Sequence, residues 1–81
     1  MSLEIERIRI ESKINSLKKA RTAEELKSEM AIINIRQEAD PLLDVLEIGV
    51  SRLEIAINNL KEAITKIQDI DGDIKKLERM L

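Results

Sequence analysis

Residues 43–81 read LDVLEIGVSRLEIAINNLKEAITKIQDIDGDIKKLERML, and an apolar side chain recurs in them every seven residues. The leading row of this repeat is formed by Leu46, Leu53, Leu60, Ile67, Ile74 and Leu81. A companion row, three or four residues away, is formed by Leu43, Val50, Ile57 and Ile64. This heptad pattern is typical of a long helix that packs lengthwise against another helix in a left-handed supercoil. We therefore predict a coiled-coil-like helix with an apolar seam.

A third row widens the seam and is formed by Gly49, Ala56, Ala63, Ile70 and Leu77. Its first members are small, which lets another helix approach closely, whereas its last members are large where Asp71 and Glu78 interrupt the companion row. Three apolar rows suit a helical bundle better than an isolated two-stranded coil. The predicted interface seam comprises Leu43, Leu46, Val50, Leu53, Ile57, Leu60, Ile64, Ile67, Ile70, Ile74, Leu77 and Leu81. Ile48 and Ile55 lie on nearly the opposite face and indicate a secondary contact.

The dipeptide Asp40-Pro41 is the clearest boundary in the chain. Aspartate is a preferred residue just before a helix, and proline is well tolerated at the first helical position. The residue before a proline also avoids the helical conformation. We therefore predict helices over residues 3–38 and 41–80, joined by a very short loop as an antiparallel hairpin.

Gly72 is a weak point within the second predicted helix, because glycine costs about 1 kcal/mol relative to alanine in a helix interior. This cost favours a break in the helix at Gly72. However, Ile67, Ile74 and Leu81 keep their spacing across this position. We favour a continuous helix and keep a break at Gly72 as the alternative.

The first segment carries apolar residues on two opposite faces. One face holds Leu3, Ile10, Ile14, Leu17, Ile32 and Ile35, and the other holds Ile5, Ile8, Ala23, Leu26, Met30 and Ile33. One interpretation is a single long helix that is buried on both faces and therefore needs more than one partner. The other is a turn near residues 20–22, where Thr22-Ala23-Glu24-Glu25 matches a capping box, which would give a three-helix bundle. We favour the continuous helix.

The composition excludes several kinds of chemistry. The 81 residues, enough for one small domain over residues 1–81, are 43% apolar and 37% charged, and they include no His, Cys, Phe, Trp or Tyr. The chain therefore lacks the residues of disulfides, ordinary zinc sites and base-stacking platforms. Asp69-Ile70-Asp71-Gly72-Asp73 resembles the start of a calcium loop, but Ile74 and Met80 occupy the places where that loop needs glycine and glutamate. We expect no enzyme activity, metal or cofactor.

The charge pattern favours neither nucleic acid nor a membrane as partner. The formal net charge is −2, and such a balance attracts neither a polyanion nor an anionic bilayer. Lys18, Lys19 and Arg21 could form a basic docking patch, although a solvated face is the simpler interpretation. No apolar run approaches the length of a membrane span, and Met1-Ser2-Leu3-Glu4 lacks the order of a signal peptide. We therefore expect a cytoplasmic protein.

Two long helices paired only with each other would leave much of this apolar surface uncovered. Exposed apolar stripes invite association, so we predict a homo-oligomer, most simply a dimer that forms a four-helix bundle. The predicted function is protein–protein interaction, as an assembly or scaffold module. The alternative is a small adaptor or chaperone that masks an amphipathic helix of another protein, with Ile48, Ile55, Ile70 and Leu77 as the contact residues.

Overall fold

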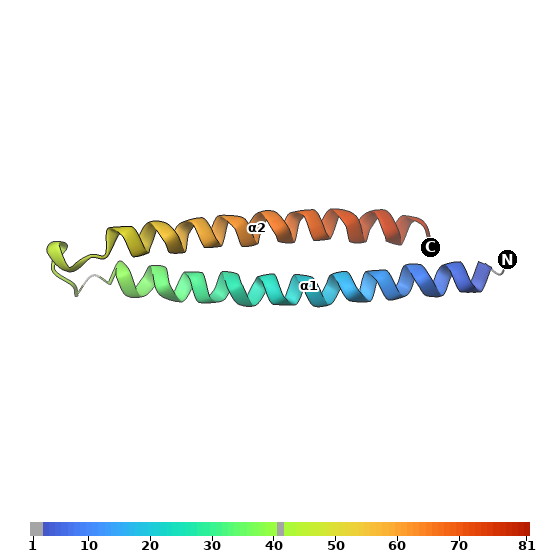
Figure 1. Cartoon of the computed structure of the whole chain (residues 1–81), viewed down its shortest axis with the longest axis horizontal. Helices are drawn as coiled ribbons and strands as arrows, with labels where there is room; N and C mark the ends of the chain where they lie inside the picture. Colours follow the sequence, from blue (N-terminus) through green and yellow to red (C-terminus); the bar gives the residue numbers. More distant parts are fainter. Residues whose placement is uncertain (1–2, 41) are drawn as a thin grey trace.

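The computed structural model, which describes residues 3–40 and 42–81, is an all-α antiparallel hairpin (Figure 1). Helix α1 spans Leu3–Glu38, a single 3₁₀ turn η1 spans Val45–Glu47, and helix α2 spans Val50–Arg79. The molecule is a rod of 66 × 15 × 14 Å. The predicted all-α helical hairpin is confirmed, whereas its dimerisation stays a prediction.

Helix α1 is continuous through residues 20–22, so the three-helix alternative is wrong. The physical reason lies in Thr22. Its hydroxyl donates a hydrogen bond of 3.1 Å to the backbone carbonyl oxygen of Lys18, one turn back in the same helix. The hydroxyl that a capping box would use is thus occupied within the helix, and the side chain of Glu25 pairs with Arg21 instead.

Helix α2 is also continuous, and it passes through Gly72 without a break. Its end at Arg79 lies close to the predicted residue 80. Its beginning does not agree with the prediction, because α2 starts at Val50 and not at residue 41. Pro41 itself lies outside the described residues.

The connection between the helices is a chain of short turns. The carboxylate of Asp40 accepts a hydrogen bond of 2.9 Å from the backbone N–H of Leu42, and the Asp40 carbonyl accepts one of 3.0 Å from Leu43. Asp44 then caps η1 by accepting from the backbone N–H of Leu46. Each aspartate therefore stabilises a local turn, and neither starts the long helix.

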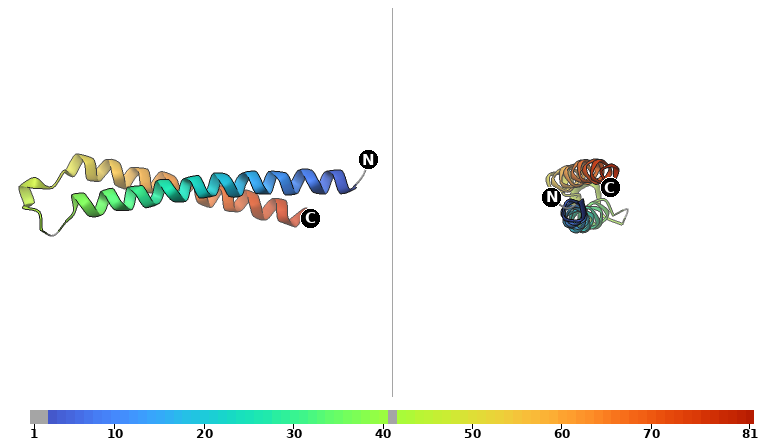
Figure 2. Two further views of the ribbon diagram at one scale, coloured as in Figure 1. Left: turned by 90° about the horizontal axis from the view of Figure 1, so that it is seen from below. Right: turned by 90° about the vertical axis from the view of Figure 1, so that its right-hand side faces the viewer.

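The pairing register of the helices explains this longer loop. Three ion pairs join α1 to α2: Arg21 with Asp71 at 2.6 Å, Glu38 with Arg52 at 2.9 Å, and Glu24 with Lys66 at 3.9 Å. A helix that began at residue 41 would bring Arg21 level with Asn58 instead of Asp71. The observed register also lets α1 project past the end of α2, as the separated termini show (Figures 1 and 2).

The contact between the helices changes character along the rod. Near the loop, the most buried residues are alanines, with Ala31, Ala56 and Ala63 only 2–3% exposed. Nearer the termini, Ile14 and Ile74 take over at 6% and 8% exposed. The small side chains suit a close approach of the backbones, and the larger ones fill the space beyond. Within the described residues, neither helix contains a stretch apolar and long enough to cross a membrane.

Candidate interaction surface

The leading and third rows of α2 supply its contact with α1. Ala56, Ala63 and Ile74 are buried, and the half-buried members of the two rows within α2 are Leu53, Leu60, Ile67, Ile70 and Leu77. The predicted seam residues that precede or follow the helix behave differently. Leu43 is half-buried in the loop, whereas Leu46 and Leu81 are exposed. The hairpin therefore brings together the central part of the predicted seam and not its two ends.

The companion row remains largely uncovered. Ile57 and Ile64 each follow a buried alanine by one residue, which turns them about 100° away from the centre of the contact. They are 36% and 44% exposed, and Val50 in the same row is exposed as well. These side chains consequently lie along one flank of the hairpin.

The position of Asp71 shows which part of α1 borders this flank. Asp71 continues the companion row, seven residues after Ile64, and it contacts Arg21, which also pairs with Glu25. Ile32 lies seven residues after Glu25 on α1 and is half-buried. Ile32 therefore borders the same flank. We call the surface formed by Ile32, Val50, Ile57 and Ile64 the isoleucine face.

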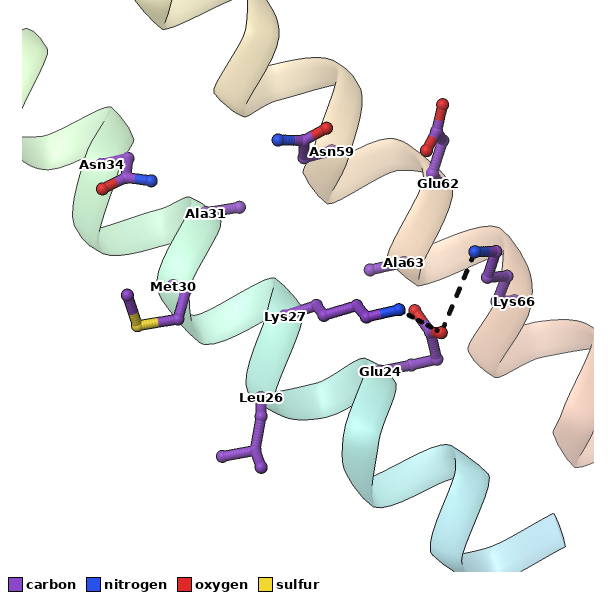
Figure 3. Close-up of a pocket in the computed structure, with 10 residues that line it drawn as sticks. All are labelled: Glu24, Leu26, Lys27, Met30, Ala31, Asn34, Asn59, Glu62, Ala63 and Lys66. Atoms are coloured by element: carbon purple, nitrogen blue, oxygen red, sulfur yellow. Dashed lines mark hydrogen bonds and ion pairs between the residues drawn. The ribbon is translucent and has the colours of Figure 1, made fainter.

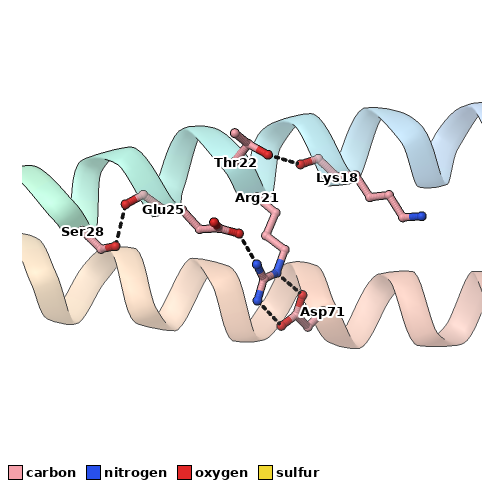
Figure 4. Close-up of polar contacts among 6 residues, drawn as sticks. All are labelled: Lys18, Arg21, Thr22, Glu25, Ser28 and Asp71. Atoms are coloured by element: carbon pink, nitrogen blue, oxygen red, sulfur yellow. Dashed lines mark hydrogen bonds and ion pairs between the residues drawn. The ribbon is translucent and has the colours of Figure 1, made fainter.

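A charged cluster of Arg21, Glu25 and Asp71 occupies the same flank farther from the loop (Figure 4). The Arg21 guanidinium donates to both carboxylate oxygens of Asp71, at 2.6 and 3.3 Å, and it pairs with Glu25 on its own helix. These hydrogen bonds from Arg21 hold the pKa of the Asp71 carboxyl below its ordinary value. The same bonds raise the pKa of Arg21. Arg21 and Asp71 are therefore both charged at neutral pH.

The opposite flank holds a groove of about 530 Å³ with a mixed lining (Figure 3). Ala31 and Ala63 lie between the helices, and Leu26 and Met30 add apolar surface. The polar and charged lining residues are Glu24, Lys27, Asn34, Asn59, Glu62 and Lys66. The carboxylate of Glu24 pairs with Lys27 at 3.2 Å and with Lys66 at 3.9 Å. Amides and charges of both signs thus lie among apolar side chains in this groove, whereas the apolar residues Ile32, Ile57 and Ile64 of the isoleucine face are grouped together.

A second apolar surface runs along the back of α1. Leu26, Met30 and Ile33 are 46–58% exposed, and Ala23 is exposed beside them. We call these four residues the back stripe. They belong to the second apolar face predicted for the first segment, which α2 leaves uncovered. Nearer the N-terminus, Ile5 and Ile8 continue that face and are exposed as well.

Ile48 and Ile55, the two residues predicted to form a secondary contact, differ in position and in exposure. Ile48 is half-buried in the loop, just before α2. Ile55 is 60% exposed and lies at the edge of the grooved flank, near Asn34 and Asn59. Among residues 3–40 and 42–81, no group of three or more acidic side chains is placed to hold a metal ion.

Comparison with known proteins identifies no relative of this chain. No protein-family model matches the chain, and no curated protein or solved structure is significantly similar to it. The exposed surfaces of the hairpin itself are therefore the features that bear on its function.

Proposed function

We propose that this chain is a self-associating protein–protein interaction module, serving assembly or scaffolding and not catalysis. In this proposal two copies pair through apolar surfaces that a single hairpin leaves open, and together they form a four-helix bundle. The main support is the amount of surface that one chain exposes.

One hairpin exposes 6587 Å² of accessible surface. A compact monomer of 9.3 kDa is expected to expose about 5,000 Å², so the excess is roughly 1,600 Å². Obligate homodimers bury about 1,000–2,500 Å² per chain, and the excess falls within that range. The radius of gyration of 18.7 Å also exceeds the roughly 12 Å expected for a compact domain of this length.

The distribution of side chains supports a closed dimer over an open array. On the grooved flank, charged and amide side chains such as Lys27, Asn34 and Asn59 interrupt the apolar ones. On the other flank Ile57 and Ile64 lie beside Ile32, so a hairpin can bury this isoleucine face against the same face of a second copy. Such a two-fold arrangement closes on itself.

Light scattering coupled to gel filtration tests this proposal, with detection by refractive index because the chain has no Trp or Tyr. We expect one species of twice the 9.3 kDa chain mass at every workable concentration, melting cooperatively. A stable, cooperatively melting monomer at micromolar concentration would overturn the proposal.

A second candidate is an adaptor or chaperone that covers an amphipathic helix of another protein. The back stripe favours it, since Leu26 and Met30 remain exposed at 58% each on a face away from the isoleucine face. Of the contact residues that the sequence suggested for this role, Ile55 is exposed, whereas Ile70 and Leu77 are half-buried against α1. An adaptor is expected to be heterogeneous alone and to become uniform when its partner is added.

A further inference from the structure

We propose that the second copy docks on the isoleucine face and that the loops of the two hairpins lie at the same end of the bundle. This inference rests on the proposed self-association and adds to it the contact surface and the orientation. The occupant is a second copy of this chain, and the competing surface is the back stripe of α1.

The isoleucine face is the better contact because both helices contribute to it. Ile32 comes from α1 and Ile57 and Ile64 come from α2, on either side of the half-buried Ile35 and Leu60. A second hairpin placed there would extend the existing apolar contact into a four-helix core. The back stripe lies on one helix only, opposite α2, so a copy docked there would form a row of helices without a shared core.

The area of the contact requires the two rods to overlap along their whole length. A face of 66 by 15 Å has a flat area of about 1,000 Å², near the lower limit for each chain of an obligate homodimer. Overlap of only the loop-proximal halves would provide roughly half of that area. Two orientations allow full overlap, with the loops at the same end or at opposite ends.

The composition of the flank decides between these orientations. Its apolar residues lie in the half near the loop, whereas Arg21, Glu25 and Asp71 lie nearer the chain ends. With loops at opposite ends, Ile57 and Ile64 of each copy would lie against the charged half of the other, and removing even a paired charge cluster from water against apolar side chains is costly. With loops at the same end, apolar residues meet apolar residues.

The charged clusters of the two copies then lie at the same height. Each cluster contains an arginine and two carboxylates. The positive charge of Lys75 also attracts the Asp71 carboxylate. Because both signs are present, facing clusters can pair with each other and need not oppose like charges. The loops-together orientation thus matches both halves of the flank.

Paired substitutions test the contact surface. The variant Ile57→Gln/Ile64→Gln changes the isoleucine face, and Leu26→Gln/Met30→Gln is the matched control on the back stripe. We expect the first variant to weaken the dimer more than about 100-fold and to elute as a monomer, with the control remaining dimeric. Circular dichroism at the same concentrations checks that each variant is helical.

The outcomes separate this inference from the proposed function. If the unsubstituted chain is a monomer, the proposed self-association is wrong. If it is a dimer that survives Ile57→Gln/Ile64→Gln but dissociates with Leu26→Gln/Met30→Gln, self-association stands and the assignment of the face is overturned.

Disulfide cross-linking tests the orientation in an otherwise native chain, which has no cysteine of its own. With loops together, each α2 lies over the partner's α1, and Ile57 is within about one helical turn of the height of the partner's Ile32. Chains carrying Ile32→Cys and Ile57→Cys are refolded together and oxidised with diamide, with one chain tagged so that the mixed product is recognised by mass.

We expect the mixed disulfide from this pair to form at least about tenfold faster than from Ile33→Cys mixed with Ile57→Cys, since Cβ atoms must come within about 4.5 Å to be bridged. A dimer in which both mixtures react equally slowly would overturn the loops-together orientation. This measurement keeps the inference testable even if the glutamine variants lose their helical structure.

Discussion

Helices α1 and α2 pack against each other, but their apolar residues are distributed differently. The apolar residues of α2 follow one broad stripe, with Leu53, Leu60 and Ile67 directed toward the partner helix. Those of α1 are divided between two faces, and the middle of its contact with α2 holds Arg21 and Glu24. The comparison shows that α2 provides a continuous apolar seam, whereas α1 meets it partly with charges.

The charges in α1 have a physical consequence for the register. A strict heptad seam looks similar after a shift of seven residues, so apolar packing alone distinguishes poorly between such registers. The pairs that Arg21 forms with Asp71 and Glu24 forms with Lys66 are lost on such a shift. The less regular helix therefore selects the alignment of the more regular one.

The largest expected effect comes from a charge placed in the regular seam. Leu60→Asp should lower the free energy of unfolding by about 3 kcal/mol or more, because it places an unpaired charge against α1. It should also dissociate the oligomer. Urea unfolding followed by circular dichroism measures the change.

The matched control is Ser51→Asp, which introduces the same side chain at an exposed position in the first turn of α2. It should have little effect or a small stabilising one, since a negative charge is favourable near a helix N-terminus. Equal losses from the two variants would mean that Leu60 does not belong to the seam.

The alanines of the close contact give the next largest effect. Ala63→Leu should cost about 1–3 kcal/mol, because Ala63 is 2% exposed between the two helices, and a larger side chain there must push them apart or turn into the groove. Ala23→Leu, on the exposed back of α1, should change the free energy of unfolding by less than about 0.5 kcal/mol. If Ala63→Leu were harmless, the helices would not approach closely at this point. Thermal unfolding measures both.

Gly72→Ala should increase stability by about 0.5–1 kcal/mol, because alanine favours a helix interior over glycine. A Cβ built at Gly72 meets no atom within 4 Å, so no clash opposes the gain. The rise in melting temperature measures the effect. An unchanged or lower melting temperature would contradict a continuous helix at this position.

The smallest effect is expected from Asp71→Asn, and its size depends on pH. The pKa of Asp71 is lowered in the fold by its hydrogen bonds to Arg21, so its contribution to stability is complete above the unfolded value of about 3.9 and is lost as the pH falls through the lower folded value. The unsubstituted chain should therefore be more stable than the variant at pH 7, and the gap should be smaller at pH 2.

Urea midpoints at the two pH values measure this gap. Asp69→Asn, an acid-to-amide change at a neighbouring exposed position, is the control and should show a smaller change in the gap. A gap for Asp71→Asn that stays constant with pH would show that the Arg21 contact does not contribute to the stability of the hairpin.

Several features of the fold could be predicted from local patterns. The end of α1 follows from the Asp40-Pro41 boundary, because the residue before a proline avoids the helical conformation. The continuity of α2 through Gly72 and the small flank of α2 near the loop follow from side-chain spacing. The beginning of α2 could not be predicted in this way. Asp40-Pro41 is a good local start signal, but Asp40 and Asp44 stabilise turns, and the ion pairs between the helices require the longer loop.

The candidate interaction surface was only partly accessible to the same reasoning. The spacing identified Val50, Ile57 and Ile64 as apolar positions of a contact, but it did not distinguish them from Ala56 and Ala63. The spacing places Ala56 and Ala63 on a small flank of the seam that lets another helix approach closely. In the hairpin they lie at the centre, since they allow the closest approach of the backbones.

The chain's own order of residues determined that it forms two long helices and that α2 carries three apolar rows, because helix periodicity depends only on neighbours a few residues apart. Only the tertiary structure decided which two rows face α1, how the helices are aligned and which row stays open. Those choices depend on contacts between residues some fifty positions apart, such as Arg21 and Asp71, and no local pattern contains that information.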